Sequence, residues 1–154
     1  MNIICPYCGG KAELTPGWMI YPLRPDLASN RYWRCGPCHA WVGCHAPNPK
    51  RGLTGVEPLG RLANAELREA KQCAHSWLDP WWKEYRMWVR HPAFTHDAKY
   101  DKARRRIIYS WLSRELGIPE SDCHIGMFDV ETCDRVSRIC EELENETVVP
   151  ERNR

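Results

Sequence analysis

The chain has 154 residues, a formal net charge of +2 and a hydrophobic content of 43%. This length suits one ordinary domain, or a metal-stapled module followed by a helical part with its own core, and we favour the second. The charge bias is much milder than that of a dedicated nucleic-acid binder. No basic leader or long apolar run occurs, and the odd count of nine cysteines fits a reducing compartment, so we expect a soluble cytoplasmic protein without a membrane partner.

Two cysteine pairs stand at the start of the chain, in Cys5-Pro6-Tyr7-Cys8 and Cys35-Gly36-Pro37-Cys38. Paired thiolates with two residues between them are the usual half-site for tetrahedral zinc, and the neighbouring glycines and prolines suit tight turns around a metal. Two disulfides or a redox Cys-x-x-Cys motif are the alternatives. We expect one structural Zn²⁺, held by Cys5, Cys8, Cys35 and Cys38.

Short β-prone segments flank both pairs. Glycine and proline break them into lengths that suit two hairpins, each ending in one knuckle of a zinc ribbon. A stretch rich in glycine and proline then follows the second pair. We expect a zinc ribbon over 1–45, a linker over 46–62, and strands over 11–15, 18–21, 31–34 and 40–42.

Helical patterns occupy the rest of the chain. Asn64 is a good N-cap for a helix running to about Leu78, and Asp79-Pro80 resembles the cap and first residue of another helix. Gly117 closes a helix, and Asp129 caps the last one. We expect helices over 64–78, 81–90, 98–116 and from 129 onwards, forming a helical domain over 63–144 with a frayed tail over 145–154. The predicted fold class is α+β, with a small antiparallel four-cysteine zinc ribbon packed on a bundle of about four helices.

Three consecutive arginines, Arg104-Arg105-Arg106, lie in the third predicted helix. Successive helical residues point about 100° apart, so the three cannot form one basic patch. Arg104 falls on the buried stripe of this helix and Arg106 lies opposite to it.

Three sequence blocks point to a known family. They are Cys5-Pro6-Tyr7-Cys8-Gly9-Gly10, the PLGRLANAELR block over 58–68 and the CHIGMFD block over 123–129. With these blocks the chain resembles a bacterial and phage family of zinc-finger-containing proteins of unknown function. The resemblance implies a compact zinc protein, often encoded by prophages, and supplies no activity.

Histidines and carboxylates accompany the loop-to-helix junctions, where unpaired helix N-terminal amides can meet a ligand. If these junctions fold together, the side chains would line one cleft able to hold a second metal, to act as acid and base, or to bind an anion. The same residues also suit local roles in packing and helix capping. The candidates are His45, His75, Asp79, His124 and Asp129.

Tryptophans and basic residues flank the second knuckle. Aromatic rings at such positions either cover the zinc site or stack on bases. The leading interpretation is a non-enzymatic, phage-type zinc-ribbon protein that binds nucleic acid or a nucleic-acid-processing partner. Alternatives are a nucleotide-like small-molecule binder or hydrolase, acting as an anti-defence factor, and an interaction module for a host or phage protein. The predicted contact residues are Arg31, Trp33, Arg34, Trp41, Lys50 and Arg51.

Overall fold

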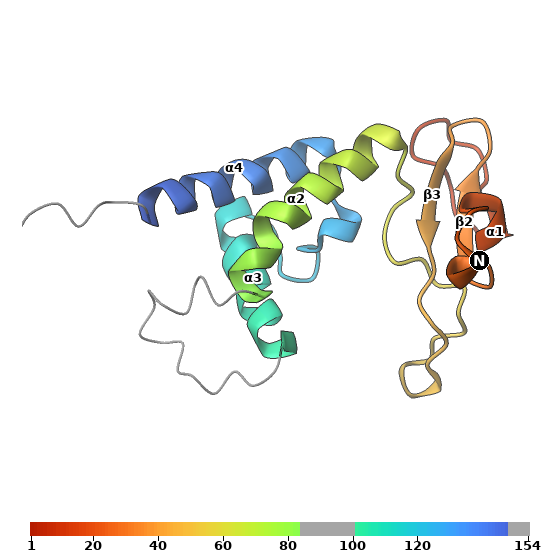
Figure 1. Cartoon of the computed structure of the whole chain (residues 1–154), viewed down its shortest axis with the longest axis horizontal. Helices are drawn as coiled ribbons and strands as arrows, with labels where there is room; N and C mark the ends of the chain where they lie inside the picture. The colour runs from red at the N-terminus through yellow and green to blue at the C-terminus, as the bar shows by residue number, and fades with distance from the viewer. Residues whose placement is uncertain (84–100, 148–154) are drawn as a thin grey trace, which may run out of the picture. The chain divides into compact units, whose positions relative to one another are not determined.

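The computed structural model describes residues 1–83 and 101–147 of the chain (Figure 1). The chain divides into two compact units, Met1–Arg68 and Glu69–Arg154. The elements of the first unit are β1 (Glu13–Pro16), α1 (Gly17–Ile20), β2 (Arg31–Cys35) and β3 (Ala40–Gly43). After them come α2 (Ala65–Lys83), α3 (Asp101–Leu116) and α4 (Val130–Thr147). A β-sheet followed by helices confirms the predicted α+β class.

The sheet has the order β1-β2-β3, and both pairings are antiparallel. Because side chains alternate along a strand, the register sorts them onto two faces. One face, called here the Trp33 face, carries Leu14, Trp33 and Val42, which pair side by side. The opposite face, called the Trp41 face, carries Arg34 and Trp41.

The strand expected over 18–21 is wrong, because this segment forms the single helical turn α1. Gly17 donates its N–H to the Asn30 carbonyl and accepts a bond from the Tyr21 N–H. A side chain at Gly17 would collide with the Leu27 carbonyl oxygen. This close approach of two loops fixes the turn, and it depends on contacts that are distant in sequence.

The core of the first unit is small and lies around the two cysteine pairs. Its buried members are at most 7% exposed, and half-buried residues of the N-terminal segment and of β3 pack against them. A core of this size gives limited hydrophobic stabilisation, and a metal bound by the cysteines would add to it. The buried members are Cys5, Ala12, Trp33, Cys35, Ala40 and Leu62.

Segment 46–62, expected to be a linker, folds within the first unit. Cys44 forms an isolated antiparallel β-bridge with Pro58, and Trp41 forms another with Ala63. The chain therefore returns alongside β3. The Leu59 N–H donates to the Gly43 carbonyl at 2.8 Å. These bonds form an irregular extension of the sheet rather than a free connection.

The predicted helix break at Asp79-Pro80 is wrong, because α2 continues through Pro80 to Lys83. Proline removes one helical hydrogen bond, but burial of the flanking turns stabilises the helix. Leu78 is fully buried and Trp81 is 3% exposed. The rest of the predicted second helix, residues 84–90, and the first residues of the third, 98–100, lie outside the described residues.

Local capping signals are confirmed elsewhere. The Leu67 N–H donates to the Asn64 side chain at 2.9 Å, and the Thr132 N–H donates to the Asp129 carboxylate at 2.9 Å. Gly117 has φ of +67°, and the N–H of the following residue reaches back to Ser113, which closes α3 in a Schellman turn. The buried residues of these helices include Ala74, Arg104, Ile108, Leu112, Cys133, Val136 and Cys140.

Candidate metal centre and basic surface

The first knuckle is a tight turn between Cys5 and Gly10. The Gly9 N–H donates to the Cys5 carbonyl at 2.9 Å, and the Cys5 N–H donates to the Gly10 carbonyl at 2.8 Å. Gly9 has φ of +71°, a conformation that favours glycine. The Gly10 N–H points at the Cys8 sulfur, 3.4 Å away. The turn therefore directs both sulfurs to the same side.

The second knuckle connects β2 to β3, and it ends in a histidine where the first knuckle has a glycine. The His39 N–H donates to the Gly36 carbonyl at 3.2 Å, closing the turn that holds Cys35 and Cys38. His39 has φ of +48°, where the first knuckle uses Gly9. Histidine enters this left-handed region more readily than β-branched residues do. The metal cluster does not include His39.

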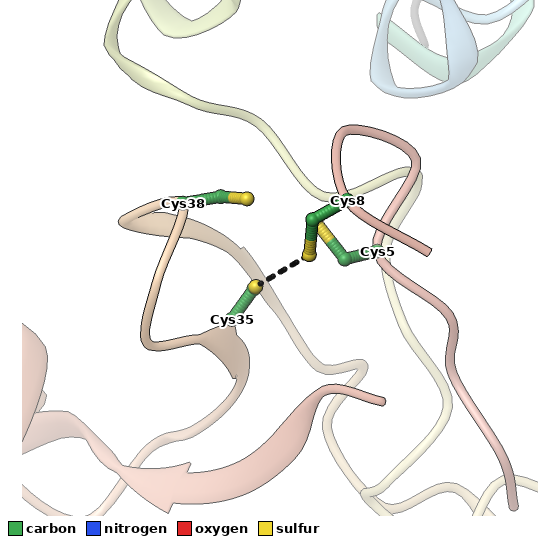
Figure 2. Close-up of side chains that lie close together, drawn as sticks. All are labelled: Cys5, Cys8, Cys35 and Cys38. Atoms are coloured by element: carbon green, nitrogen blue, oxygen red, sulfur yellow. Dashed lines mark hydrogen bonds between the residues drawn. The ribbon is translucent and has the colours of Figure 1, made fainter. Parts of the chain in front are cut away.

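The four sulfur atoms converge from the two knuckles, as Figure 2 shows. All lie within 4.8 Å of one another, and the Cys8 and Cys35 sulfurs are 3.6 Å apart. Tetrahedral zinc with Zn–S bonds of about 2.3 Å places its sulfurs about 3.8 Å apart. A disulfide requires about 2.05 Å, and all nine cysteines are free. The geometry thus favours a metal over two disulfides.

The ionisation of the four thiols is strongly interdependent. Burial opposes ionisation of Cys5, but hydrogen bonds from the backbone N–H groups of Tyr7 and Cys8 outweigh it and lower the Cys5 pKa to about 7. A hydrogen bond with the Cys8 thiol, reinforced by burial, raises the Cys38 pKa to about 12. One thiol therefore ionises easily and another resists. A bound dication favours the thiolate form of all four.

The cluster fits one structural Zn²⁺. Cys5 and Cys35 are buried, Cys38 is half-buried and Cys8 is exposed. Four sulfur ligands fill a tetrahedral shell and leave no open position for a substrate, which is typical of structural sites. The metal would join the N-terminal knuckle to the β2–β3 turn.

His75 and Asp79 lie one turn apart on α2, as the sequence predicts, and they interact. His75 Nδ1 is 3.2 Å from the Asp79 carboxylate, which also accepts bonds from Lys83 at 2.8 Å and Trp82 at 3.2 Å. Burial opposes ionisation of Asp79, but the bonds from Lys83 and His75 outweigh it and lower the pKa of Asp79. Its carboxylate is thus occupied by neighbours on its own helix.

His124 and Asp129 take part in local bonds. His124 Nδ1 accepts the Gly126 N–H at 3.0 Å, and its ring stacks on Tyr109 with centroids 5.9 Å apart. Asp129 accepts bonds from both the N–H and the hydroxyl of Thr132. Asp129 is therefore the N-cap of α4. Burial raises the pKa of Tyr109, although the hydrogen bond and the positive charge of Arg105 oppose this shift.

The five cleft candidates divide between the units. His45 belongs to the first, and His75, Asp79, His124 and Asp129 belong to the second. Within residues 1–83 and 101–147, the four cysteines form the only group of three or more metal-binding side chains. A catalytic role for these residues stays a prediction.

Trp33 is buried, with 7% of its surface exposed. Its indole N–H donates to the Val56 carbonyl at 2.7 Å. The ring packs in the core of the first unit, so it is not available for stacking on a base. Trp33 is packed in the same buried core as Cys5 and Cys35. This position fits a ring that covers the zinc site rather than one that stacks on a base.

Trp41 lies on the opposite face and is half-buried. The Arg68 guanidinium lies 3.4 Å from the centroid of a Trp41 ring and donates to the Ala63 carbonyl at 2.6 Å. The Tyr21 ring meets Trp41 edge-on, and its hydroxyl accepts the indole N–H. Part of the Trp41 surface is thus already covered. Sequence reasoning does not single out Arg68, although its place in the PLGRLANAELR block is a signal.

The basic residues predicted from sequence are not neutralised. Within the described part of the chain, Arg31, Arg34, Lys50 and Arg51 form no ion pair. Arg31 and Arg34 point to opposite faces of β2. Lys50 and Arg51 lie in the short 3₁₀ turn Pro49–Arg51. Trp18 on α1 is 58% exposed, and no sequence motif marks it as a functional residue.

A three-stranded antiparallel sheet with a four-cysteine cluster defines a zinc-binding protein of the zinc-ribbon class. The chain belongs to a family described as a zinc-finger-containing domain, whose model matches residues 1–143 and whose function is unknown. Comparison with curated proteins and with solved structures gave no match. Among the described helices, none has both the length and the apolar character needed to cross a membrane.

Proposed function

We propose that the first unit binds nucleic acid through its basic side chains Arg34, Lys50 and Arg51, and that zinc maintains the fold that carries them. The observation that supports the proposal is the set of basic side chains without ion pairs. Residues 1–68 hold eight Lys and Arg against four Asp and Glu. One of those carboxylates, Asp26, is paired with Arg24 at 2.6 Å. Arg68 is engaged with Trp41 and the Ala63 carbonyl, and Arg34, Lys50 and Arg51 are left to neutralise phosphates.

The first unit also has one strongly exposed tryptophan. Trp18 is 58% exposed on α1, whereas Trp33 is buried and Trp41 is partly covered by Arg68. Exposed aromatic rings beside cations suit single strands, whose bases stack on them regardless of sequence. We therefore expect preference for a single strand over a duplex, with little dependence on sequence.

The test is a triple variant, Arg34→Gln with Lys50→Gln and Arg51→Gln. Binding of fluorescent single strands and duplexes should be measured between about 50 and 200 mM salt. The slope of log affinity against log salt is negative, and each lost phosphate contact should reduce its magnitude by about 0.7 for a single strand. Arg31 stays unchanged because it also lines a cavity in the same unit.

The matched control removes three exposed cations from α3, in Lys102→Gln with Arg106→Gln and Arg114→Gln. It changes the net charge equally and leaves the first unit intact. We expect nearly unchanged affinity and slope for the control. Equal weakening of both variants, or binding that does not respond to salt, would count against the proposal.

A further inference from the structure

A cavity of about 350 Å³ opens at the end of the sheet away from the zinc knuckles, within the first unit. Its walls are the start of β2, the segment after β3, and the loop that returns along β3. This volume lies at the lower end of the range for small-ligand sites. The polar side chains that line it include Ser29, Asn30, Arg31 and His45.

These four side chains have unused hydrogen-bonding capacity. Arg31, His45, Asn30 and Ser29 make no side-chain hydrogen bond within the part of the chain that the structure describes. Arg31 also has no carboxylate partner there. Its planar guanidinium can give two parallel bonds to an oxyanion. Amide, hydroxyl and imidazole groups beside it can complete the shell of donors.

The Glu57 carboxylate stabilises the wall of the cavity. Glu57 accepts bonds from the N–H and hydroxyl of Thr54 and from the N–H of Gly55, at 2.8 to 3.0 Å. These bonds, with the Thr54 hydroxyl as the largest contribution, lower the Glu57 pKa to about 2. Glu57 therefore stays ionised while fixing the loop that carries Thr54. It makes no ion pair with Arg31, which is left for a ligand.

The same loop carries two further positive charges. Lys50 and Arg51 lie between Pro47 and Thr54, two residues that line it. Arg31, Lys50 and Arg51 supply three positive charges, whereas Glu57 supplies one negative charge and already accepts hydrogen bonds. This excess of positive charge favours an anion. The volume exceeds what inorganic phosphate alone requires, and Ala46 and Pro47 supply an apolar part of the wall.

We propose that this cavity binds a phosphate monoester of nucleotide size, with Arg31 holding the phosphate oxygens and Asn30, Ser29 and His45 completing the contacts. The ligand is either a free nucleotide or the terminal nucleotide of a strand. Binding of a strand terminus rests on the nucleic-acid function proposed above, whereas binding of a free nucleotide does not.

The experiment titrates the zinc-loaded full chain with adenosine 5′-monophosphate, inorganic phosphate and uncharged adenosine. Amide chemical shifts in NMR spectra report the place and the affinity. We expect shifts at 29–31, 44–46 and 54–55 with the two phosphates and much weaker effects with adenosine. Arg31→Gln should weaken phosphate binding about tenfold or more, because a charged hydrogen bond is lost.

Lys11→Gln is the matched control, since it removes one positive charge from an exposed residue of the first unit that does not line the cavity. We expect less than about a threefold change for it, from the general potential alone. Zinc content and thermal unfolding of each variant show that the fold persists. No shifts with either phosphate up to about 10 mM, or equal weakening in both variants, would overturn the proposal.

Competition separates the two sources and the two proposals. If adenosine 5′-monophosphate displaces a bound 5′-phosphorylated strand, the cavity takes a strand end. If both bind without competing, it takes free nucleotides. If the wild-type chain binds adenosine 5′-monophosphate but no strand, only the proposed nucleic-acid function is contradicted. If it binds a strand but no adenosine 5′-monophosphate, only the proposed cavity site is contradicted.

Discussion

At the scale of single residues, Arg68 connects the start of α2 to the Trp41 face of the sheet. Its guanidinium lies 3.4 Å from the Trp41 ring centroid and donates to the carbonyls of Ala63 and His39. Burial lowers the pKa of Arg68, yet an arginine stays charged at any working pH. Stacking and hydrogen bonding act through one side chain, so both depend on the planar group.

Replacing Arg68 by Ala should reduce the free energy of unfolding of the first unit by about 2 kcal/mol. Arg68→Lys should restore only part of it, because an ammonium cannot stack and bond two carbonyls together. Urea unfolding at a fixed free zinc concentration measures the change. Arg61→Ala, a nearby arginine with no hydrogen bond or ion pair in the described chain, is the control and should be near neutral. Equal losses at the two positions would argue against a specific role.

At the scale of elements, signals that act within a few residues predict structure well in this chain. Asn64 and Asp129 cap helices through their own side chains, and the glycine-bearing turns bring the cysteines of each pair together. Two errors arise where distant contacts decide. The turn at Gly17 depends on the Leu27 carbonyl, and the passage of α2 through Pro80 depends on burial around it.

Candidate site residues follow the same division. The four zinc ligands can be predicted because their spacing is local, whereas the burial of Trp33 against Val56 joins segments far apart in sequence. The cavity beside Arg31 brings together the segments before β2 and after β3 with the 54–55 loop. No spacing rule connects those segments, so sequence alone predicts Arg31 and His45 as candidates without showing that they share a site.

Pro80 gives a direct test of the continuous helix. In the interior of a helix, proline is about 3 kcal/mol less favourable than alanine, although alanine also increases the entropy of the unfolded chain. Pro80→Ala should therefore raise the stability of the second unit by about 1 to 2 kcal/mol, seen as a higher midpoint in thermal unfolding. If Pro80 instead began a new helix, proline would be favourable there and the variant would be neutral or less stable.

At the scale of the whole molecule, the two units differ in what stabilises them. The first has a small core around four cysteines, and the second has helices with buried leucine, isoleucine and valine side chains. Metal binding supplies about 10–16 kcal/mol in zinc-finger peptides, more than a small core can provide. The second unit has no cluster of metal-binding side chains within its described residues. Zinc removal should therefore affect the units unequally.

Cys35→Ser should abolish zinc binding and unfold the first unit while the helices of the second persist. Elemental analysis should find one zinc per wild-type chain and far less in the variant. Circular dichroism should keep most of its helical signal, and NMR should lose the dispersed resonances of the strands. Cys73→Ser, an exposed cysteine outside the cluster, makes the same exchange and should retain zinc. Because the cavity beside Arg31 and the cations on the loop belong to the first unit, Cys35→Ser should also lose both phosphate and strand binding. A variant that keeps its sheet without metal would contradict the structural role of zinc.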